Sequence, residues 1–151
     1  MECFLTESDF DSFAYNGSAK VYNFLNKELK MGSLPHETFV VLFLNVQNRM
    51  EGYCVVSQGI VDRALIHPRE VFRLAVMTNC SRVIFAHNHP SGLASVSPQD
   101  KLATRELVDA AEILGIKVLD HIIVTSNGYL SFKEFGIMPS RKEAKFSISE
   151  N

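Results

Sequence analysis

The sequence has few of the features that mark membrane-spanning or secreted proteins. No window of its 151 residues approaches the roughly 18 consecutive apolar residues that a membrane-spanning helix needs. The first ten residues, MECFLTESDF, are acidic and contain no basic segment of the kind that begins a secretory signal peptide. We therefore expect a cytoplasmic protein.

Cysteine is also scarce. The three cysteines, Cys3, Cys54 and Cys80, are scattered, odd in number and form no C-x-x-C pair. This arrangement argues against a disulfide framework and against a zinc ribbon, and we expect three reduced thiols in a reducing compartment. Cys80 is expected to be a small buried hydrophobic side chain rather than a nucleophile.

An excess of positive charge is absent. The chain has 15 basic and 17 acidic residues, a net charge of −2, and no evident basic stripe. Proteins that bind nucleic acid usually carry a basic surface. DNA contact is therefore possible but not favoured, and residues 139–151 are interpreted as a solvated tail of mixed charge.

What the sequence does contain is a regular alternation of helical and extended patterns. Hydrophobic residues make up 46% of the chain, enough for one domain with a substantial core. Apolar spacing predicts helices over about 18–29, with Ser18 as N-cap and Gly32 as terminator, and over 68–78 and 98–114. Strands are predicted over 38–46, 52–58, 82–86, 117–125 and 129–132, while residues 1–17 show no clear periodicity.

These patterns predict the fold class and the organisation of the chain. Hairpins at both ends and helices between the strands indicate an α/β (α+β) domain, with a mixed, mostly antiparallel sheet flanked by helices. We divide the chain into an N-terminal segment (1–34) with one amphipathic helix, a main domain (35–138) and the charged tail (139–151).

Two histidines stand one residue apart where the predicted strand 82–86 ends. In an extended chain the side chains of His87 and His89 point to the same side, and Pro90 biases His89 towards an extended conformation. The two imidazoles can therefore converge. The same residues also fit a simple surface turn, because H-x-H alone is a weak signal for a metal.

Asp100 has two compatible interpretations. Ser97-Pro98-Gln99-Asp100 has the pattern of a capping box, with serine at the N-cap, proline at the first helical position and an acid at the third. A capped helix start also holds a carboxylate rigidly, as a metal ligand requires. Gly92 gives the intervening loop the freedom to adopt a positive φ and bring Asp100 back to the histidines.

Two histidines and one aspartate are the ligands of a catalytic rather than a structural zinc. Structural zinc sites use four protein ligands, mostly thiolates, whereas catalytic sites use three and leave one position for water. Such a site also needs a carboxylate that acts as a base. The candidates are glutamates on different predicted elements: Glu37, Glu51, Glu70 and Glu106.

From Glu37 to about Met138 the sequence resembles the RadC-type JAMM (MPN) metallohydrolase domain. The resemblance rests on His87-x-His89-Pro90-x-Gly92 followed by Ser97-x-x-Asp100, with a glutamate far upstream. The segments ALIHPREVF (64–72) and LDHIIV (119–124) support this resemblance. Val96 stands where the family often has proline. Only 36 residues precede Glu37, so we expect a short form without the helix-hairpin-helix region of longer RadC proteins.

The resemblance implies a cytidine deaminase-like fold and a set of roles. His87, His89 and Asp100 would bind one zinc ion with water as fourth ligand. Ser97 would stabilise the water or an oxyanion, and the upstream glutamate, assigned to Glu37 with Glu51 as fallback, would be the general acid and base.

The resemblance also implies the reaction and leaves one alternative. The expected activity is zinc-dependent hydrolysis of an amide bond, of peptidase or isopeptidase type, on an unknown protein or peptide, in a family historically linked to DNA repair. The alternative is a scaffold module of the same fold that holds a protein or DNA without cleaving it.

The remaining histidines are predicted to lie outside the ligand set. His121, in an apolar strand, is expected to be a hydrogen-bonded core or near-site residue rather than a ligand. His67 is expected to cap or pack beside the helix that starts at Pro68, and His36 to be exposed.

Overall fold

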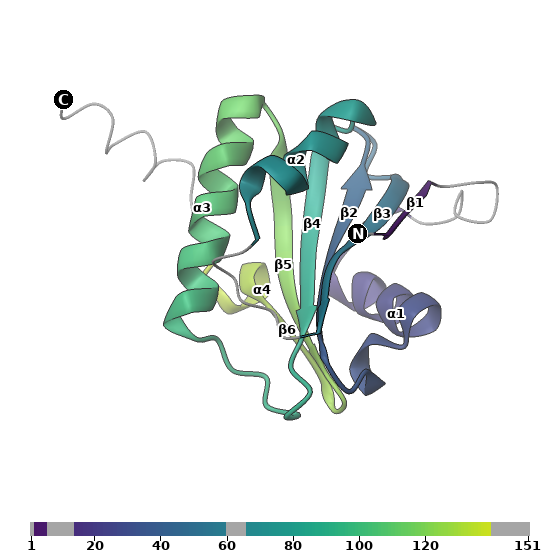
Figure 1. Cartoon of the computed structure of the whole chain (residues 1–151), viewed down its shortest axis with the longest axis vertical. Helices are drawn as coiled ribbons and strands as arrows, with labels where there is room; N and C mark the ends of the chain where they lie inside the picture. The colour runs from purple at the N-terminus through teal and green to yellow at the C-terminus, as the bar shows by residue number, and fades with distance from the viewer. Residues whose placement is uncertain (1, 6–13, 60–65, 140–151) are drawn as a thin grey trace.

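The protein is built around one six-stranded sheet (Figure 1). The computed structural model describes residues 2–5, 14–59 and 66–139. The strands are β1 (Glu2–Leu5), β2 (Glu37–Leu44), β3 (Met50–Gly59), β4 (Arg82–Asn88), β5 (Lys117–Thr125) and β6 (Gly128–Ser131). The helices are α1 (Ser18–Leu29), the short 3-10 helix η2 (Met31–Ser33), α2 (Pro68–Met77), α3 (Pro98–Leu114) and α4 (Phe132–Phe135).

The sheet is mixed and mostly antiparallel, with the strand order β1-β3-β2-β4-β5-β6. Every neighbouring pair is antiparallel except β4 and β5, which run parallel and are joined by α3. A parallel pair needs a crossover connection of this kind. The predicted fold class is confirmed.

Helices cover both faces of the sheet (Figure 1). On one face, α1 packs its side chains Val21 and Leu25 into a core with Val40, Leu42 and Ile84 of the sheet. On the other, α2 and α3 pack over a second apolar cluster, which includes alternate residues of β2 and β4. A central strand that is buried on both faces has apolar side chains on both sides. This explains why polar and apolar residues do not alternate in TFVVLF.

The ends of the two central strands differ from the predicted ones. β2 ends at Leu44, two residues early, because Val46 lies in a turn with 69% of its surface exposed. β4 continues two residues beyond Ala86, through His87 and Asn88. The first histidine of the pair is therefore held by the sheet and not by a loop.

The N-terminal part of the chain departs from expectation in two ways. Glu2–Leu5 forms β1, which pairs with β3, although residues 1–17 show no periodicity that predicts a strand. The prediction that all three cysteines are reduced is wrong for Cys54, which is disulfide-bonded. In the backbone register of β1 and β3, Cys54 stands opposite Cys3. Cys80 is free and buried, as predicted.

The predicted ends of the first helix are also corrected. Gly17, not Ser18, occupies the N-cap position, and Lys30, with a φ of 50°, ends the helix in place of Gly32. Gly32 lies in η2, where an added Cβ would come within 3.0 Å of the Asn26 side chain and of the Thr125 carbonyl oxygen. A glycine fits at this position because the backbone approaches β5 closely, and not because it ends a helix.

Across the part of the chain that the structure describes, the helices are too short or too polar to span a lipid bilayer.

Candidate metal centre

The candidate site lies where β4 leaves the sheet and α3 begins. β4 ends at Asn88, and the chain turns through residues 89–97 before α3 starts at Pro98 (Figure 1). Gly92 in this turn has a φ of 83°, as its predicted role requires. The turn brings the amino end of α3 back to the end of β4, so residues on both elements face one another.

The capping box at the start of α3 fixes Asp100. The Ser97 side-chain oxygen accepts from the Asp100 backbone N–H, and Asp100 Oδ2 accepts from the Ser97 backbone N–H, each at 3.0 Å. Both bonds of the predicted box are present. Asp100 is 1% exposed, so its carboxylate is held inside the protein at the positive end of a helix.

Potential ligand atoms of three residues converge on one point. His87 Nε2 lies 3.0 Å from His89 Nε2 and 3.5 Å from Asp100 Oδ1, and His89 Nε2 lies 3.8 Å from Asp100 Oδ2. Ligands bound tetrahedrally at 2.0–2.2 Å stand about 3.3 Å apart. The observed separations bracket that value. Among the residues that the structure describes, these three form the cluster capable of holding a metal ion.

The hydrogen bonding of His89 leaves Nε2 available. Its Nδ1 lies 3.1 Å from the Leu93 carbonyl oxygen, which can only accept, so Nδ1 carries the proton. The Nε2 lone pair then points at His87 and Asp100. Electron-rich atoms packed this closely repel one another unless a cation lies between them, and imidazole with carboxylate is a donor set that suits zinc. The residues therefore fit a bound metal ion.

Glu37 is positioned beside this cluster by a contact from β4. Glu37 begins β2, which is antiparallel to β4, so the start of β2 lies next to the end of β4. The buried Asn88 side chain accepts from the Thr38 N–H at 2.6 Å and donates to the His36 carbonyl oxygen at 3.0 Å. These two bonds hold the backbone on either side of Glu37.

All the sequence-predicted site residues except His87 line one cavity. A cavity of about 300 Å³ is lined by Glu37, His89, Ser97 and Asp100, together with residues of the intervening turn. Ser97 and Glu37 are half-buried there. Because Ser97 Oγ accepts from the Asp100 backbone, it retains its own proton for another acceptor.

The other glutamates lie elsewhere. Glu51 stands at the far end of β3 from Gly59, the residue that pairs with Glu37. Eight residues of strand separate the two ends, roughly 26 Å. Glu70 pairs with Arg73 on α2 at 3.9 Å, and Glu106 is exposed on α3.

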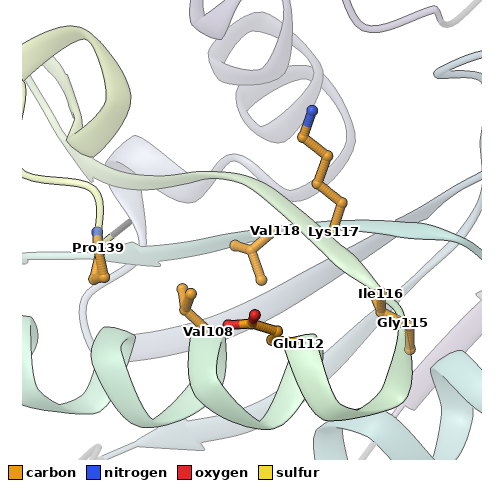
Figure 2. Close-up of a pocket in the computed structure, with 7 residues that line it drawn as sticks. All are labelled: Val108, Glu112, Gly115, Ile116, Lys117, Val118 and Pro139. Atoms are coloured by element: carbon orange, nitrogen blue, oxygen red, sulfur yellow. The ribbon is translucent and has the colours of Figure 1, made fainter. Parts of the chain in front are cut away.

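A larger cavity, of about 510 Å³, lies at the opposite end of α3 (Figure 2). Val108 and Glu112 of the helix face Val118 of β5 and Pro139 across it. Val108 and Glu112 come 8 and 12 residues after Asp100 in α3, so the helix separates this cavity from Asp100 by roughly 12–18 Å. The second cavity contains none of the predicted site residues.

Burial and contacts of His121 and His36 agree with their predicted roles, whereas the side chain of His67, at the N-cap position of α2, makes no capping bond. His121 is 1% exposed and lies behind His87, with Nε2 2.7 Å from His87 Nδ1. His36 and His67 are exposed. The Asp120 carboxylate accepts hydrogen bonds from Ser131, from the Lys133 N–H and from the His121 N–H, and so supports the start of α4 and the backbone of β5.

Sequence reasoning missed two residues at the site, Asn88 and Thr104. Thr104 Oγ1 lies 2.6 Å from His121 Nδ1 and donates to the Asp100 carbonyl oxygen at 2.8 Å. The available signal for Thr104 was its position one helical turn after Asp100. For Asn88 the signal was only a polar residue between two candidate ligands.

Comparison with known proteins agrees with the geometry. The family model described as the RadC-like JAB domain matches residues 15–137, a range that includes α1. A UPF0758 protein of Aromatoleum aromaticum is 44% identical over 89% of this chain and 59% of its own length. A UPF0758 protein of Thermotoga maritima is 43% identical over 80% of this chain and 53% of its own length.

The chain thus spans about half the length of the curated relatives it matches. The family match covers most of the described residues, including all three potential metal ligands and Glu37. By this match the chain belongs to the family of RadC-like JAB domains.

Proposed function

We propose that this domain is a zinc-dependent hydrolase that cleaves an amide bond in a protein or peptide. One observation carries the proposal: two potential ligands, a glutamate and a serine line the same cavity, and the third ligand lies directly behind it. Amide hydrolysis needs an activated water, a proton for the leaving amine and a donor to the oxyanion. The chain offers a group for each need.

His87, His89 and Asp100 would hold the metal ion. Three nitrogen and oxygen ligands leave one coordination position open, which is the pattern of catalytic zinc. Zinc bound there would act as a Lewis acid that polarises a carbonyl and activates water at neutral pH. The rigidity of Asp100, fixed by both bonds of the capping box, favours a constant ligand geometry.

Glu37 would move the proton. Its carboxylate takes a proton from the attacking water and passes it to the amine as the carbon–nitrogen bond breaks, which balances the reaction without another acid. The position of Glu37 at the cavity wall supports this role. Ser97, which keeps its hydroxyl proton, would donate to the oxyanion that forms on the former carbonyl.

The first experiment is elemental analysis of the protein purified without added metal, for the wild type and for His89→Ala. We expect about one zinc per wild-type chain and little in the variant, because His89 supplies one of three ligands. Absence of metal from both proteins, even after zinc is supplied, would leave His87, His89 and Asp100 as a turn and a capped helix, and the metallohydrolase proposal would fail.

The second experiment tests the chemistry with Glu37→Gln. Wild type and variant are incubated with a peptide library and with isopeptide-linked substrates, and new amino groups are measured. We expect the variant to keep its zinc and to lose about 10²–10⁴-fold in rate. Glu51→Gln, which changes the same group at the far end of β3, should keep both.

Two results would contradict the catalytic proposal. Cleavage by Glu37→Gln at the wild-type rate would remove Glu37 from the mechanism. Stoichiometric zinc without cleavage of any substrate offered would favour a scaffold with a structural metal.

A further inference from the structure

We propose that Thr104 and His121 form a hydrogen-bond relay that fixes the proton of His87 on Nδ1, and that this relay raises the affinity of the site for its metal. The proposal rests on the metal site of the proposed function. It concerns residues that lie behind the potential ligands and do not line the cavity.

The relay connects two of the ligands through the protein interior. His121 lies on β5, parallel to β4, and its Nε2 is 2.7 Å from His87 Nδ1. Its other nitrogen, Nδ1, is 2.6 Å from Thr104 Oγ1 on α3. Thr104 Oγ1 is also 2.8 Å from the Asp100 carbonyl oxygen. His121 and Thr104 are at most 1% exposed.

Counting protons assigns a direction to every bond. A carbonyl oxygen only accepts and a hydroxyl has one proton, so Thr104 donates to the Asp100 carbonyl and accepts from His121 Nδ1. Neutral imidazole has one N–H, so His121 Nε2 is an acceptor and the proton between the two rings belongs to His87 Nδ1. The lone pair of His87 then lies on Nε2.

Nε2 is the atom that the metal requires. It faces His89 Nε2 at 3.0 Å and Asp100 Oδ1 at 3.5 Å. Metal-ligating histidines usually donate their other N–H to an acceptor, which fixes the tautomer and makes the ligand more basic. Here the acceptor is a second histidine, whose own tautomer is set by a threonine.

The opposite direction would not supply a proton to every contact of the relay. If Thr104 gave its proton to His121 Nδ1, His121 would donate to His87, and the proton of His87 would move to Nε2 and point at His89. This arrangement leaves the 2.8 Å contact between Thr104 and the Asp100 carbonyl without a proton. The Thr104 hydroxyl therefore favours the direction that accepts a metal.

Aromatic side chains surround the His121 ring and hold it in place. Phe132 stacks on His121 with ring centroids 4.7 Å apart, and Phe39 and Phe85 meet it edge-on at 5.9 and 6.0 Å. Hydrogen bonds are stronger in such a low-dielectric setting.

The test uses Thr104→Val, which keeps the shape of the side chain and removes the hydroxyl, and Thr104→Ser, which restores the hydroxyl. Thr78→Val is the matched control, because Thr78 also donates to the carbonyl four residues earlier in its helix but lies at the end of α2. Zinc affinity of the full chain is measured by competition with a chelator, and the melting temperature of the metal-free protein is recorded for each variant.

We expect Thr104→Val to weaken zinc binding about 10- to 100-fold, the usual effect of removing a partner of a ligand. Thr104→Ser should stay close to wild type, and Thr78→Val should leave the affinity unchanged. A loss of affinity in Thr104→Val that Thr104→Ser repairs supports the relay.

A spectroscopic measurement reads the tautomer directly. Long-range ¹H–¹⁵N correlation spectra of the metal-free wild type should show His87 protonated at Nδ1, and Thr104→Val should reduce that population.

The relay is overturned if wild type binds zinc and Thr104→Val binds it equally well, or if His87 carries its proton on Nε2 in the metal-free wild type. A wild type that binds no metal overturns the proposed function and the relay with it.

Discussion

Asp100→Asn separates two roles that the structure gives to one side chain. Asp100 Oδ2 accepts the Ser97 N–H in the capping box, and Oδ1 faces His87 Nε2 at 3.5 Å. Asparagine can keep an oxygen for Ser97 and place an N–H group where Oδ1 stood. The substitution therefore preserves the cap and replaces a ligand lone pair by a donor.

The expected magnitudes differ sharply with and without metal. In the metal-free protein the lost charge at the start of α3 costs about 0.3–1 kcal/mol, and a new donor towards the His87 lone pair opposes that cost. We expect a net change in the free energy of unfolding of less than about 1 kcal/mol. Zinc at about 1,000 times its Kd should stabilise the wild type by about 4 kcal/mol.

For a chain of this size, 1 kcal/mol corresponds to about 2–4 °C in the melting temperature. Zinc should then raise the wild-type Tm by about 8–16 °C, and the Tm of Asp100→Asn hardly at all. Thermal unfolding followed by circular dichroism, with zinc and with a chelator, measures both proteins. The same rise in Tm for both would refute the assignment of Asp100 as a ligand.

Ser97→Ala is the complementary variant. It removes the hydrogen bond from the Asp100 N–H to Ser97 Oγ, and with it about 1 kcal/mol of helix capping. This loss should be equal with zinc and with chelator, so the rise in Tm on adding zinc should remain. If zinc no longer raises the Tm of Ser97→Ala, the capping bond and metal binding by Asp100 are not independent of one another.

Three further outcomes follow from the contacts of buried polar groups. Asn88→Ala removes both bonds that hold the backbone beside Glu37, so we expect unchanged zinc content and a rate lower by about 10²-fold, in the substrate assay that Glu37→Gln requires. Burial raises the pKa of Asp120 above its ordinary value of 3.8, and hydrogen bonds, first that from Ser131, oppose the shift. A raised folded-state pKa means that the contribution of Asp120 to stability is present below its unfolded-state pKa and is lost as the pH rises through its folded-state pKa. Urea titrations from pH 3 upward should therefore show a free energy of unfolding that falls with pH in the wild type and falls less steeply in Asp120→Asn. Burial also raises the pKa of the Cys80 thiol, so a thiol reagent should label Cys80 only as the chain unfolds, and fast labelling of the native protein would contradict its buried position.

The elements with local signals could be predicted from the sequence. The periodicity of α2 and α3, the glycine that ends α3 and the two bonds of the capping box depend on residues within a few positions of one another. The doubly buried β2 was evident from its uninterrupted apolar residues. The fold class followed from these elements, because few arrangements bury so many apolar strands and amphipathic helices together.

The missed features depend on register, which short-range patterns do not determine. Asn88 meets the backbone of Thr38 fifty residues away, and His121 meets His87 across two parallel strands. The register of β4 and β5 contains a shift between Val83 and Ile84, so no simple counting would have paired these residues. The strand β1 is a similar case, since it exists through pairing with β3 and not through its own periodicity.

The topology explains why a site forms at this end of the sheet and not elsewhere. β2 runs antiparallel to β4, so the start of one lies beside the end of the other. Phe39 pairs with His87, and Glu37, two residues earlier, lines the same cavity as His89. The crossover from β4 to β5 brings the positive end of α3 to the same place, with Asp100 in its first turn. A slip of one residue between β4 and β5 would turn His121 to the opposite face and leave His87 Nδ1 without an acceptor. The pairing register of the central strands therefore determines both the fold and the chemistry that the histidines can perform.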